Sequence, residues 1–231
     1  GVASLPYHHP LMVANRMVLL DHLTRGRVML GVGPGALVSD AYQLGIDPPT
    51  QRPRMDESIG IIKRLLTESN PITYKSDWFT LNEALLHLRP YTQPHFPIAV
   101  AAAQSPSGMV AAGKHGLGVL SVSVVRGGSI SSNLSDFWNI AEETAESYGQ
   151  TVDRKEWRIV LHVHLAESRK EALEQVRERS AAYQYDYFHQ TMGMPFDYDG
   201  PREKIADYMV ANGAWCVGTP DDLIAKIKEL D

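Results

Sequence analysis

A glycine-rich stretch that ends a run of apolar residues constrains the fold of this chain more than any other feature. Residues 27–35 read Arg-Val-Met-Leu-Gly-Val-Gly-Pro-Gly. The aliphatic and β-branched residues are typical of a strand buried on both faces, and the glycines allow the backbone to approach a ligand closely. In parallel α/β sheets, ligands bind at the carboxyl ends of the strands. The stretch therefore predicts a β/α protein with its functional site at this strand's carboxyl end.

Strands and helices alternate along the rest of the chain, as a β/α fold requires. Parallel-type strands are predicted at about five places: residues 1–5, 27–33, 98–102, 117–124 and 158–166. A closed β/α barrel has eight strands, so we expect strands of the barrel to lie outside both ends of this sequence.

Two predicted helices show apolar residues at helical spacing. The first begins at Pro10 and ends at Gly26, with these apolar positions: Met12, Val13, Met17, Leu20 and Leu23. The second has Pro53 near its first turn and this predicted buried face: Met55, Ile59, Ile62 and Leu66. Both patterns favour helices that pack one face against a sheet.

Two segments interrupt the alternation within what we interpret as one domain, residues 1–231. Residues 71–97 hold short β-like runs bounded by turn-forming residues, which predicts an inserted hairpin over a barrel rim. Residues 184–201 are rich in aromatic residues and glycine. Further along, Gly-Thr-Pro-Asp-Asp at residues 218–222 predicts a capped helix start, and Ser168 with Glu171 predicts a capping box.

Composition narrows the class of protein. The 231 residues are 44% hydrophobic, enough to bury a full core, and the net charge of −5 comes without a cluster of Lys and Arg that could follow a phosphate backbone. Nucleic acid is therefore not an expected partner. The single cysteine, Cys216, excludes an internal disulfide framework and fits a reducing compartment. No apolar run is long enough to span a bilayer, so we expect no membrane partner and a soluble, cytoplasmic protein.

Two motifs suggest phosphate or cofactor binding. Residues 31–36 formally match the G-x-G-x-x-G/A dinucleotide fingerprint, but Pro34 lies inside the turn and no strand ending in Asp or Glu follows about 20 residues later. A Rossmann site is therefore not indicated. The loop Ala103 to Gly108 is a better anion site because serine hydroxyls and backbone N–H groups meet at a helix N-terminus. Arg52, at the start of the preceding helix, could add a bidentate phosphate contact.

Two histidine pairs are candidate ligands. His8 and His9 follow the first strand and could line a substrate pocket, and His162 and His164 share one strand face. Neither pair has a suitably spaced third ligand, so we predict no metal site and interpret these side chains as polar residues that line a barrel.

Several stretches together are similar to the bacterial luciferase-like flavin monooxygenases. They are Leu-Pro-Tyr-His-His-Pro at 5–10, Leu-Asp-His-Leu-Thr-Arg-Gly-Arg-Val at 20–28, Gly-Val-Gly-Pro-Gly at 31–35 and Gly-Thr-Pro-Asp-Asp at 218–222. Residues 73–79 and 112–116 also resemble the limonene monooxygenase-like group of that family. The resemblance implies a (β/α)8 TIM barrel whose first two strands precede Gly1 and whose last follows Asp231.

The resemblance also implies a cofactor, partners and site residues. The cofactor would be reduced FMN supplied by a separate flavin reductase, which reacts with dioxygen so that one oxygen atom passes to a small hydrophobic substrate, terpene- or aldehyde-like. The positions that match the family's cofactor contacts are Gly1 and Val2 (a non-proline cis peptide under the flavin ring), Gly33 (the reactive ring edge), and the phosphate loop and its arginine, Arg52, Ala103, Gln104, Ser105, Ser107 and Gly108. Many relatives carry arginine where this chain has Pro34.

The same resemblance implies that residues 184–213 form a mobile lid, that the protein is a homo-oligomer, and that the family's catalytic histidine lies on the second strand, outside this sequence. We therefore assign no catalytic residue. Two alternatives remain: a deazaflavin-dependent dehydrogenase on the same barrel, and a non-catalytic flavin-binding relative.

Overall fold

The computed structural model describes residues 2–102, 106–122, 130–193 and 196–230. The chain divides into two compact units, Gly1–Leu120 with Ile140–Arg158 and Ser121–Asn139 with Ile159–Asp231. Each unit is described by itself below. Among the described residues, no helix is both long and apolar enough to cross a membrane.

The first unit contains most of a sheet in the order β1-β2-β5-β6-β7, in which the last two residues of β6 and of β7 are assigned to the second unit. Its strands are β1 (Ala3–Ser4), β2 (Leu30–Gly33), β5 (Ile98–Ala101), β6 (Gly118–Val122) and β7 (Trp157–Val160). The pairs β1-β2, β2-β5 and β5-β6 are parallel, with Leu30 opposite Ile98 and Ala99 opposite Gly118. The predicted glycine strand is therefore confirmed, and it lies inside a parallel sheet.

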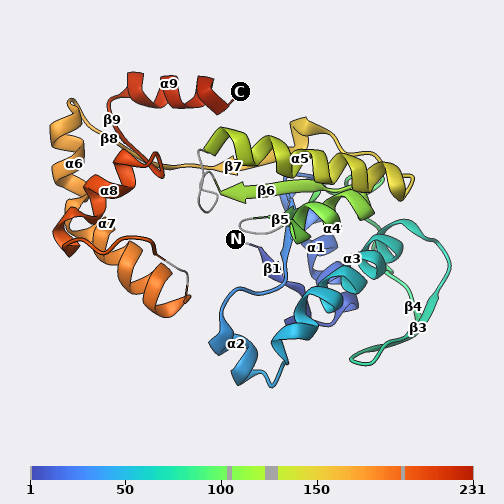
Figure 1. The fold of residues 1–231 in the computed structure, drawn as a ribbon. Helices are drawn as coiled ribbons and strands as arrows, with labels where there is room; N and C mark the ends of the chain where they lie inside the picture. The colour runs from blue at the N-terminus through green and yellow to red at the C-terminus, as the bar shows by residue number, and fades with distance from the viewer. Residues whose placement is uncertain (1, 103–105, 123–129, 194–195, 231) are drawn as a thin grey trace. The chain divides into compact units, whose positions relative to one another are not determined.

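Helices connect these parallel strands, which confirms the predicted alternation (Figure 1). They are α1 (Pro10–Thr24), α2 (Val38–Gln43), α3 (Gln51–Thr67), α4 (Ser107–His115) and α5 (Ile130–Ser147), with short 3-10 turns at Leu5–Tyr7, Pro48–Thr50 and Arg154–Glu156. No helix was predicted between residues 36 and 50, so α2 is an addition to the predicted fold.

The predicted buried faces of α1 and α3 agree with the structure to different degrees. On α3 the predicted face is buried, with Ile59 and Ile62 almost fully so. On α1 the predicted Val13 is buried, together with Val18, but the predicted Met12, Leu20 and Leu23 are exposed. The reason is Asp21, which is fully buried and accepts hydrogen bonds from the backbone N–H and hydroxyl of Thr92, both at 2.8 Å. This polar anchor fixes which side of α1 faces inward.

Residues 71–97 contain two strands, β3 (Ile72–Lys75) and β4 (Thr80–Ala84), which pair antiparallel. The hairpin is attached to α3 through one carboxylate. Glu57 accepts hydrogen bonds from the Tyr74 hydroxyl (2.8 Å), the Ser76 hydroxyl (2.8 Å) and the Trp78 indole N–H (2.7 Å). Three donors on one carboxylate hold the hairpin against the helix layer.

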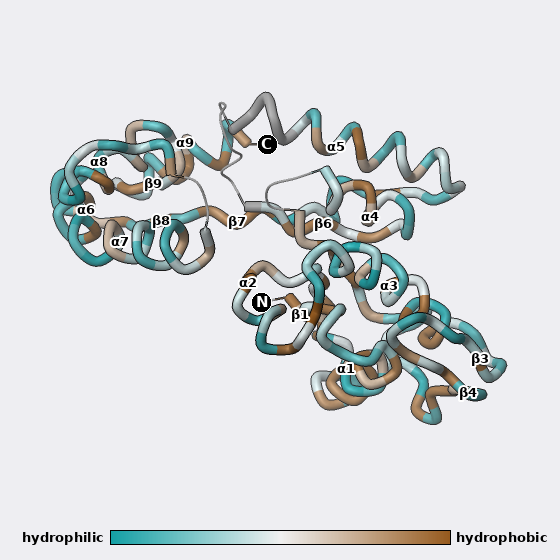
Figure 2. The backbone as a smooth tube through the Cα atoms, turned by 60° about the horizontal axis from the view of Figure 1, so that its bottom comes forward, coloured by the Kyte–Doolittle hydropathy of each residue, from teal (hydrophilic) through white to brown (hydrophobic). Residues whose placement is uncertain are grey.

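The second unit contains a two-stranded parallel sheet, β8 (His162–Leu165) and β9 (Trp215–Gly218). Its helices are α6 (Arg169–Arg177), α7 (Arg179–Ala182), a π-helix (Tyr183–Thr191), a 3-10 turn (Arg202–Lys204), α8 (Ile205–Ala211) and α9 (Pro220–Leu230). The core joins helix residues to β9: Val176, Ala181, Ile205, Ala206, Met209, Ala214 and Trp215. Only one side of α6 enters this core, and Figure 2 shows that the helix is mostly hydrophilic.

Neither the strand β9 nor the helix at residues 183–191 was predicted from the sequence. The strand β9 has only four residues and no alternating pattern, so its length and composition gave no signal.

Candidate functional site

Loops at the carboxyl ends of β1, β2 and β5 lie at one edge of the first unit's sheet, because these strands run parallel. The turn after β1 carries Tyr7, the loop after β2 carries Gly33 to Gly35, and α4 begins a few residues after β5. The N-terminal end of α3 contacts all three. This edge is the candidate site that the glycine strand predicted.

Two of the predicted cofactor positions, Val2 and Gly33, lie in contact. A Cβ atom added at Gly33 would lie 3.1 Å from Cγ2 of Val2 and 3.7 Å from Cβ of Ala101. The side chains nearest to Gly33 are therefore the small ones of Val2 and Ala101. Small side chains at these positions suit a flat ligand.

Gln51, the first residue of α3, ties the loops after β1 and β2 together. Its Nε2 donates to the Tyr7 hydroxyl oxygen at 2.8 Å and to the Pro34 carbonyl oxygen at 2.9 Å. Gly35 has φ +90°, and a Cβ atom there would overlap the Tyr7 hydroxyl. Glycine at this position therefore meets two requirements at once, a left-handed backbone and room for a phenol.

Arg52, the second residue of α3, reaches the start of α4. Its Nε donates to the Ser107 hydroxyl at 3.2 Å across 55 positions of sequence. Ser107 is the first residue of α4, and the first turn of that helix holds no acidic residue. The first N–H groups of a helix have no acceptor within the helix, and its dipole favours an anion there. We call Arg52, Ser107 and the first turn of α4 the anion corner.

Gly108 explains how the anion corner comes so close to the sheet. A Cβ atom at this position would lie 2.6 Å from the Ala101 carbonyl oxygen and 2.7 Å from the Ala102 Cβ. Only glycine allows the first turn of α4 to pack this tightly on the end of β5. The contact of Gly108 with a phosphate, implied by the resemblance, stays a prediction.

Four of the predicted positions lie outside the described residues: Gly1, Ala103, Gln104 and Ser105. The expected cis peptide between residues 1 and 2 also lies there. These assignments stay predictions.

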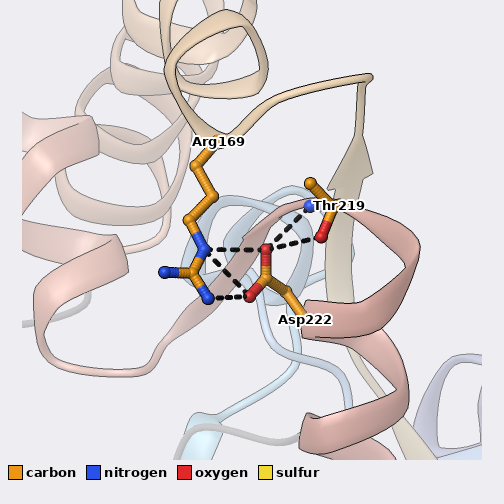
Figure 3. Close-up of polar contacts among 3 residues, drawn as sticks. All are labelled: Arg169, Thr219 and Asp222. Atoms are coloured by element: carbon orange, nitrogen blue, oxygen red, sulfur yellow. Dashed lines mark hydrogen bonds and ion pairs between the residues drawn. The ribbon is translucent and has the colours of Figure 1, made fainter.

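A second helix N-terminus, that of α9, differs in its chemistry. Asp222 accepts hydrogen bonds from the Thr219 backbone N–H at 2.8 Å and from the Thr219 hydroxyl at 3.0 Å, and it pairs with the Arg169 guanidinium at 2.5 and 3.0 Å (Figure 3). The guanidinium and the Thr219 N–H hold the pKa of this carboxyl well below its usual range. The predicted capped helix start is confirmed, and the anion there is the protein's own.

His8 and His9, predicted as possible pocket residues, have different surroundings in the structure. His8 is exposed, while His9 contacts the hairpin, with its ring edge-on to Phe79 at 5.6 Å and its Nε2 3.4 Å from the Thr80 carbonyl oxygen. Neither arrangement supports a pocket lined by both side chains. Across the described residues, no three His, Cys, Asp or Glu side chains are grouped to hold a metal ion.

The expectation that His162 and His164 line a barrel is not supported. Nε2 of His164 lies 2.6 Å from Oε1 of Gln175 on α6. His162 pairs in register with Trp215, which belongs to the core under the helices, and its ring meets Phe188 of the π-helix edge-on. Both histidines therefore face helices. Burial lowers the pKa of His162, which favours its neutral form.

Sequence reasoning missed a network that joins α3 to the far end of α4. Asp56 pairs with His115 Nε2 at 2.8 Å and with Lys114 Nζ at 2.6 Å, and Lys63 Nζ donates to the His115 carbonyl oxygen. The hydrogen bond from His115 lowers the pKa of Asp56, although partial burial opposes the shift. Because the partners are 58 and 59 positions apart, no local spacing could reveal them. The network and the anion corner hold α4 to α3 at both ends.

Comparisons with known proteins identify the family and support the fold. The model of the family described as luciferase-like monooxygenase matches residues 1–231. The chain is 42% identical to 4-hydroxyprotoasukamycin monooxygenase of Streptomyces nodosus subsp. asukaensis and 42% identical to limonene 1,2-monooxygenase of Rhodococcus erythropolis, in both cases over all 231 residues. It spans 62% and 58% of the lengths of those two relatives.

The structure is also similar to that of the oxygenating constituent of 3,6-diketocamphane monooxygenase from Pseudomonas putida, solved with FMN. The TM-score is 0.75 and the identity 24%, over 99% of this chain and 67% of that one. This likeness confirms the predicted barrel fold. The family match over all residues and the two relatives carry the classification: the chain belongs to the luciferase-like monooxygenase family.

Proposed function

We propose that this chain forms the FMN-phosphate site of a flavin-dependent monooxygenase. The observation that carries the proposal is the anion corner, where the Arg52 guanidinium and the Ser107 hydroxyl meet at the start of α4. A guanidinium, a hydroxyl and free helix N–H groups are the donors that phosphate recognition in proteins uses most. The donor set therefore fits the phosphate of FMN.

The flat part of the cofactor would lie against the glycine strand. Val2, Gly33 and Ala101 form a face with small side chains at the same sheet edge as the anion corner. Such a face would support a planar ring without clashes, which agrees with the matched positions in the family. The FMN complex of the diketocamphane enzyme supports the choice of cofactor.

When bound, FMN in its reduced form would supply the oxygen chemistry with dioxygen, so the protein need only bind, orient and exclude water. We propose a small hydrophobic acceptor, terpene- or aldehyde-like, as the substrate. Reduced FMN would come from a separate reductase, in keeping with a relative named as the oxygenase component of trigonelline monooxygenase. The segment 184–213 would act as a lid, and the cytoplasmic location is part of the same proposal.

A homo-oligomer is also proposed. The exposed side of α1 carries Met12, Leu20 and Leu23, whose exposed fractions are 45%, 43% and 69%. Apolar side chains gathered on one helix side are typical of surfaces that become covered.

The experiment uses the full-length protein, titrated with FMN and reduced FMN, followed by oxygen consumption with a panel of terpenes and aldehydes. We expect binding of reduced FMN and substrate-dependent oxygen consumption with oxygenated product. Absence of binding by either form of FMN would contradict the proposal. Binding without turnover on the panel would favour a non-catalytic flavin-binding relative.

A deazaflavin-dependent dehydrogenase is the second candidate, because the chain is 28% identical over 173 residues to an F420-dependent glucose-6-phosphate dehydrogenase of Amycolatopsis mediterranei. The same titration with F420 separates the two. We expect FMN to bind more tightly, whereas a clear preference for F420 would replace the monooxygenase assignment.

A further inference from the structure

The hydroxyl proton of Tyr7 has no hydrogen-bond acceptor among the described residues. The Tyr7 oxygen accepts a hydrogen bond from Gln51 Nε2 at 2.8 Å, and this is the hydroxyl's only hydrogen bond among the described residues. A phenol both accepts and donates, so a hydroxyl held by a donor on one side directs its own proton away from that donor. The proton of Tyr7 therefore points away from Gln51 with no acceptor in the described structure.

The orientation of this hydroxyl is fixed from several sides. Tyr7 ends the 3-10 turn Leu5–Tyr7 directly after β1 and is partly buried. Gln51 is itself held by its second hydrogen bond, to the Pro34 carbonyl oxygen at 2.9 Å. Gly35 lies against the phenol where any side chain would overlap it. A donor held this firmly is prepared for an acceptor in one direction.

The charge environment keeps Tyr7 in its donor form. Burial and the nearby Asp40 carboxylate both raise the pKa of the phenol, and the hydrogen bond from Gln51 opposes them only in part. Among the described residues Asp40 makes no hydrogen bond with the phenol. Its negative charge disfavours the phenolate but does not accept the phenol's proton. Tyr7 is thus a neutral donor throughout the physiological pH range.

We propose that Tyr7 is a ligand-binding residue that donates a hydrogen bond to an acceptor oxygen or nitrogen of the small molecule held at the carboxyl edge of the sheet. The inference rests on the proposed function, in which that molecule is FMN. Gln51 acts through Tyr7 as a positioning residue. Its neighbour Arg52 belongs to the anion corner, so one end of α3 serves both contacts.

The test compares Tyr7→Phe with Tyr74→Phe in the full-length protein. Tyr74 is the matched control because its hydroxyl also makes one 2.8 Å hydrogen bond. Tyr74 lies on the hairpin strand β3, and its partner is Glu57 of α3. Each protein is titrated with FMN and with riboflavin. We expect Tyr7→Phe to weaken FMN binding about three- to tenfold, the range for one neutral hydrogen bond, and Tyr74→Phe to leave it unchanged.

Riboflavin locates the acceptor. An equal loss for both flavins places it on the ring or the ribityl chain, with a shift of the visible flavin absorption when it is on the ring. A loss for FMN alone places it on the phosphate. Either result supports the proposal.

A second variant, Gln51→Met, keeps the hydroxyl but removes its orientation, and we expect a smaller loss in the same direction. If the wild-type protein binds FMN and both variants bind it equally well, the inference about Tyr7 is wrong while the proposed function stands. If the wild-type protein binds neither flavin, the proposed function itself fails.

Discussion

Two helices that each follow a parallel strand, α4 after β5 and α9 after β9, begin with opposite chemistry. The first turn of α9 holds Asp222, which accepts from the Thr219 N–H and is neutralised by Arg169. The first turn of α4 holds no acid and instead gathers the Ser107 hydroxyl and the Arg52 guanidinium. Both helices have a positive N-terminal end. At α9 a carboxylate of the chain itself lies there, whereas the first turn of α4 carries hydrogen-bond donors.

The difference shows that a helix N-terminus alone does not identify an anion site. What decides is whether the chain provides its own carboxylate. In α9 the negative charge is built in, and a bound anion would be repelled by it. The first turn of α4 holds no acidic residue, which is why the anion corner carries the functional proposal.

The sharpest way to break the comparison is Ser107→Asp, which gives α4 its own carboxylate beside Arg52. We expect the affinity for FMN to fall roughly 100-fold or more, because a fixed negative charge repels the phosphate, while the melting temperature is kept or raised. Flavin titration and thermal unfolding measure the two effects. Ser168→Asp adds the same charge at the N-cap of α6 and serves as the control. FMN binding that survives Ser107→Asp would contradict the assignment.

Arg52→Met tests the cation of the anion corner and keeps most of the side-chain stem. We expect FMN affinity to fall about tenfold to a hundredfold, the range for hydrogen bonds to a charged group. The matched control is Arg54→Met, because Arg54 lies on the same helix but stacks over the Trp78 ring at 5.3 Å. An equal loss in both variants would mean that the effect is general to α3.

Gly108→Ala tests the close approach of α4 to the sheet. The added methyl would lie 2.6 Å from the Ala101 carbonyl oxygen, so we expect a destabilisation of about 1–3 kcal/mol in denaturant unfolding, with weaker FMN binding. Gly60→Ala is the control, since its nearest neighbour would be His115 Cε1 at 3.6 Å and α3 should tolerate it. A stable Gly108→Ala variant would show that α4 can shift.

Asp222→Asn tests the start of α9, and of the four variants we expect it to change the measured properties least. The depressed pKa of Asp222 means that its stabilisation is present at neutral pH and is lost as pH falls below about 4, the ordinary carboxyl pKa, toward its folded value. We expect the variant to melt a few degrees lower at pH 7, with the gap narrowing under acid conditions, and FMN affinity unchanged. Asp221→Asn, in the same turn, is the control. A gap that does not depend on pH would contradict the role of the charge.

Local patterns predicted much of the fold. The apolar spacing on α3 placed its buried face, and the caps at Ser168 and Thr219 placed the starts of α6 and α9. On α1 Val13 is buried as predicted, but Leu20 and Leu23 are exposed. The helix is held instead by the buried carboxylate of Asp21, whose partner lies 71 positions away. Short elements such as β9 were missed because four residues carry too little periodicity.

In the candidate site too, some residues were predicted from local patterns and others depend on contacts between distant residues. Spacing indicated the glycine strand. The loop motif at residues 103–108 and the resemblance both indicated Arg52 and Ser107, whose side chains the structure brings within 3.2 Å. Gln51 was missed because its two partners, Tyr7 and Pro34, lie 44 and 17 positions away. Contacts of that range depend on the tertiary fold, and no local pattern encodes them.

The most direct test of the anion corner is the affinity of the full-length wild-type protein for FMN relative to riboflavin, which differs only by lacking the phosphate. We predict that FMN binds at least about tenfold more tightly, the contribution of charged hydrogen bonds to a phosphate, and that Arg52→Met removes most of the difference. Equal affinity for the two flavins in the wild-type protein would contradict the account.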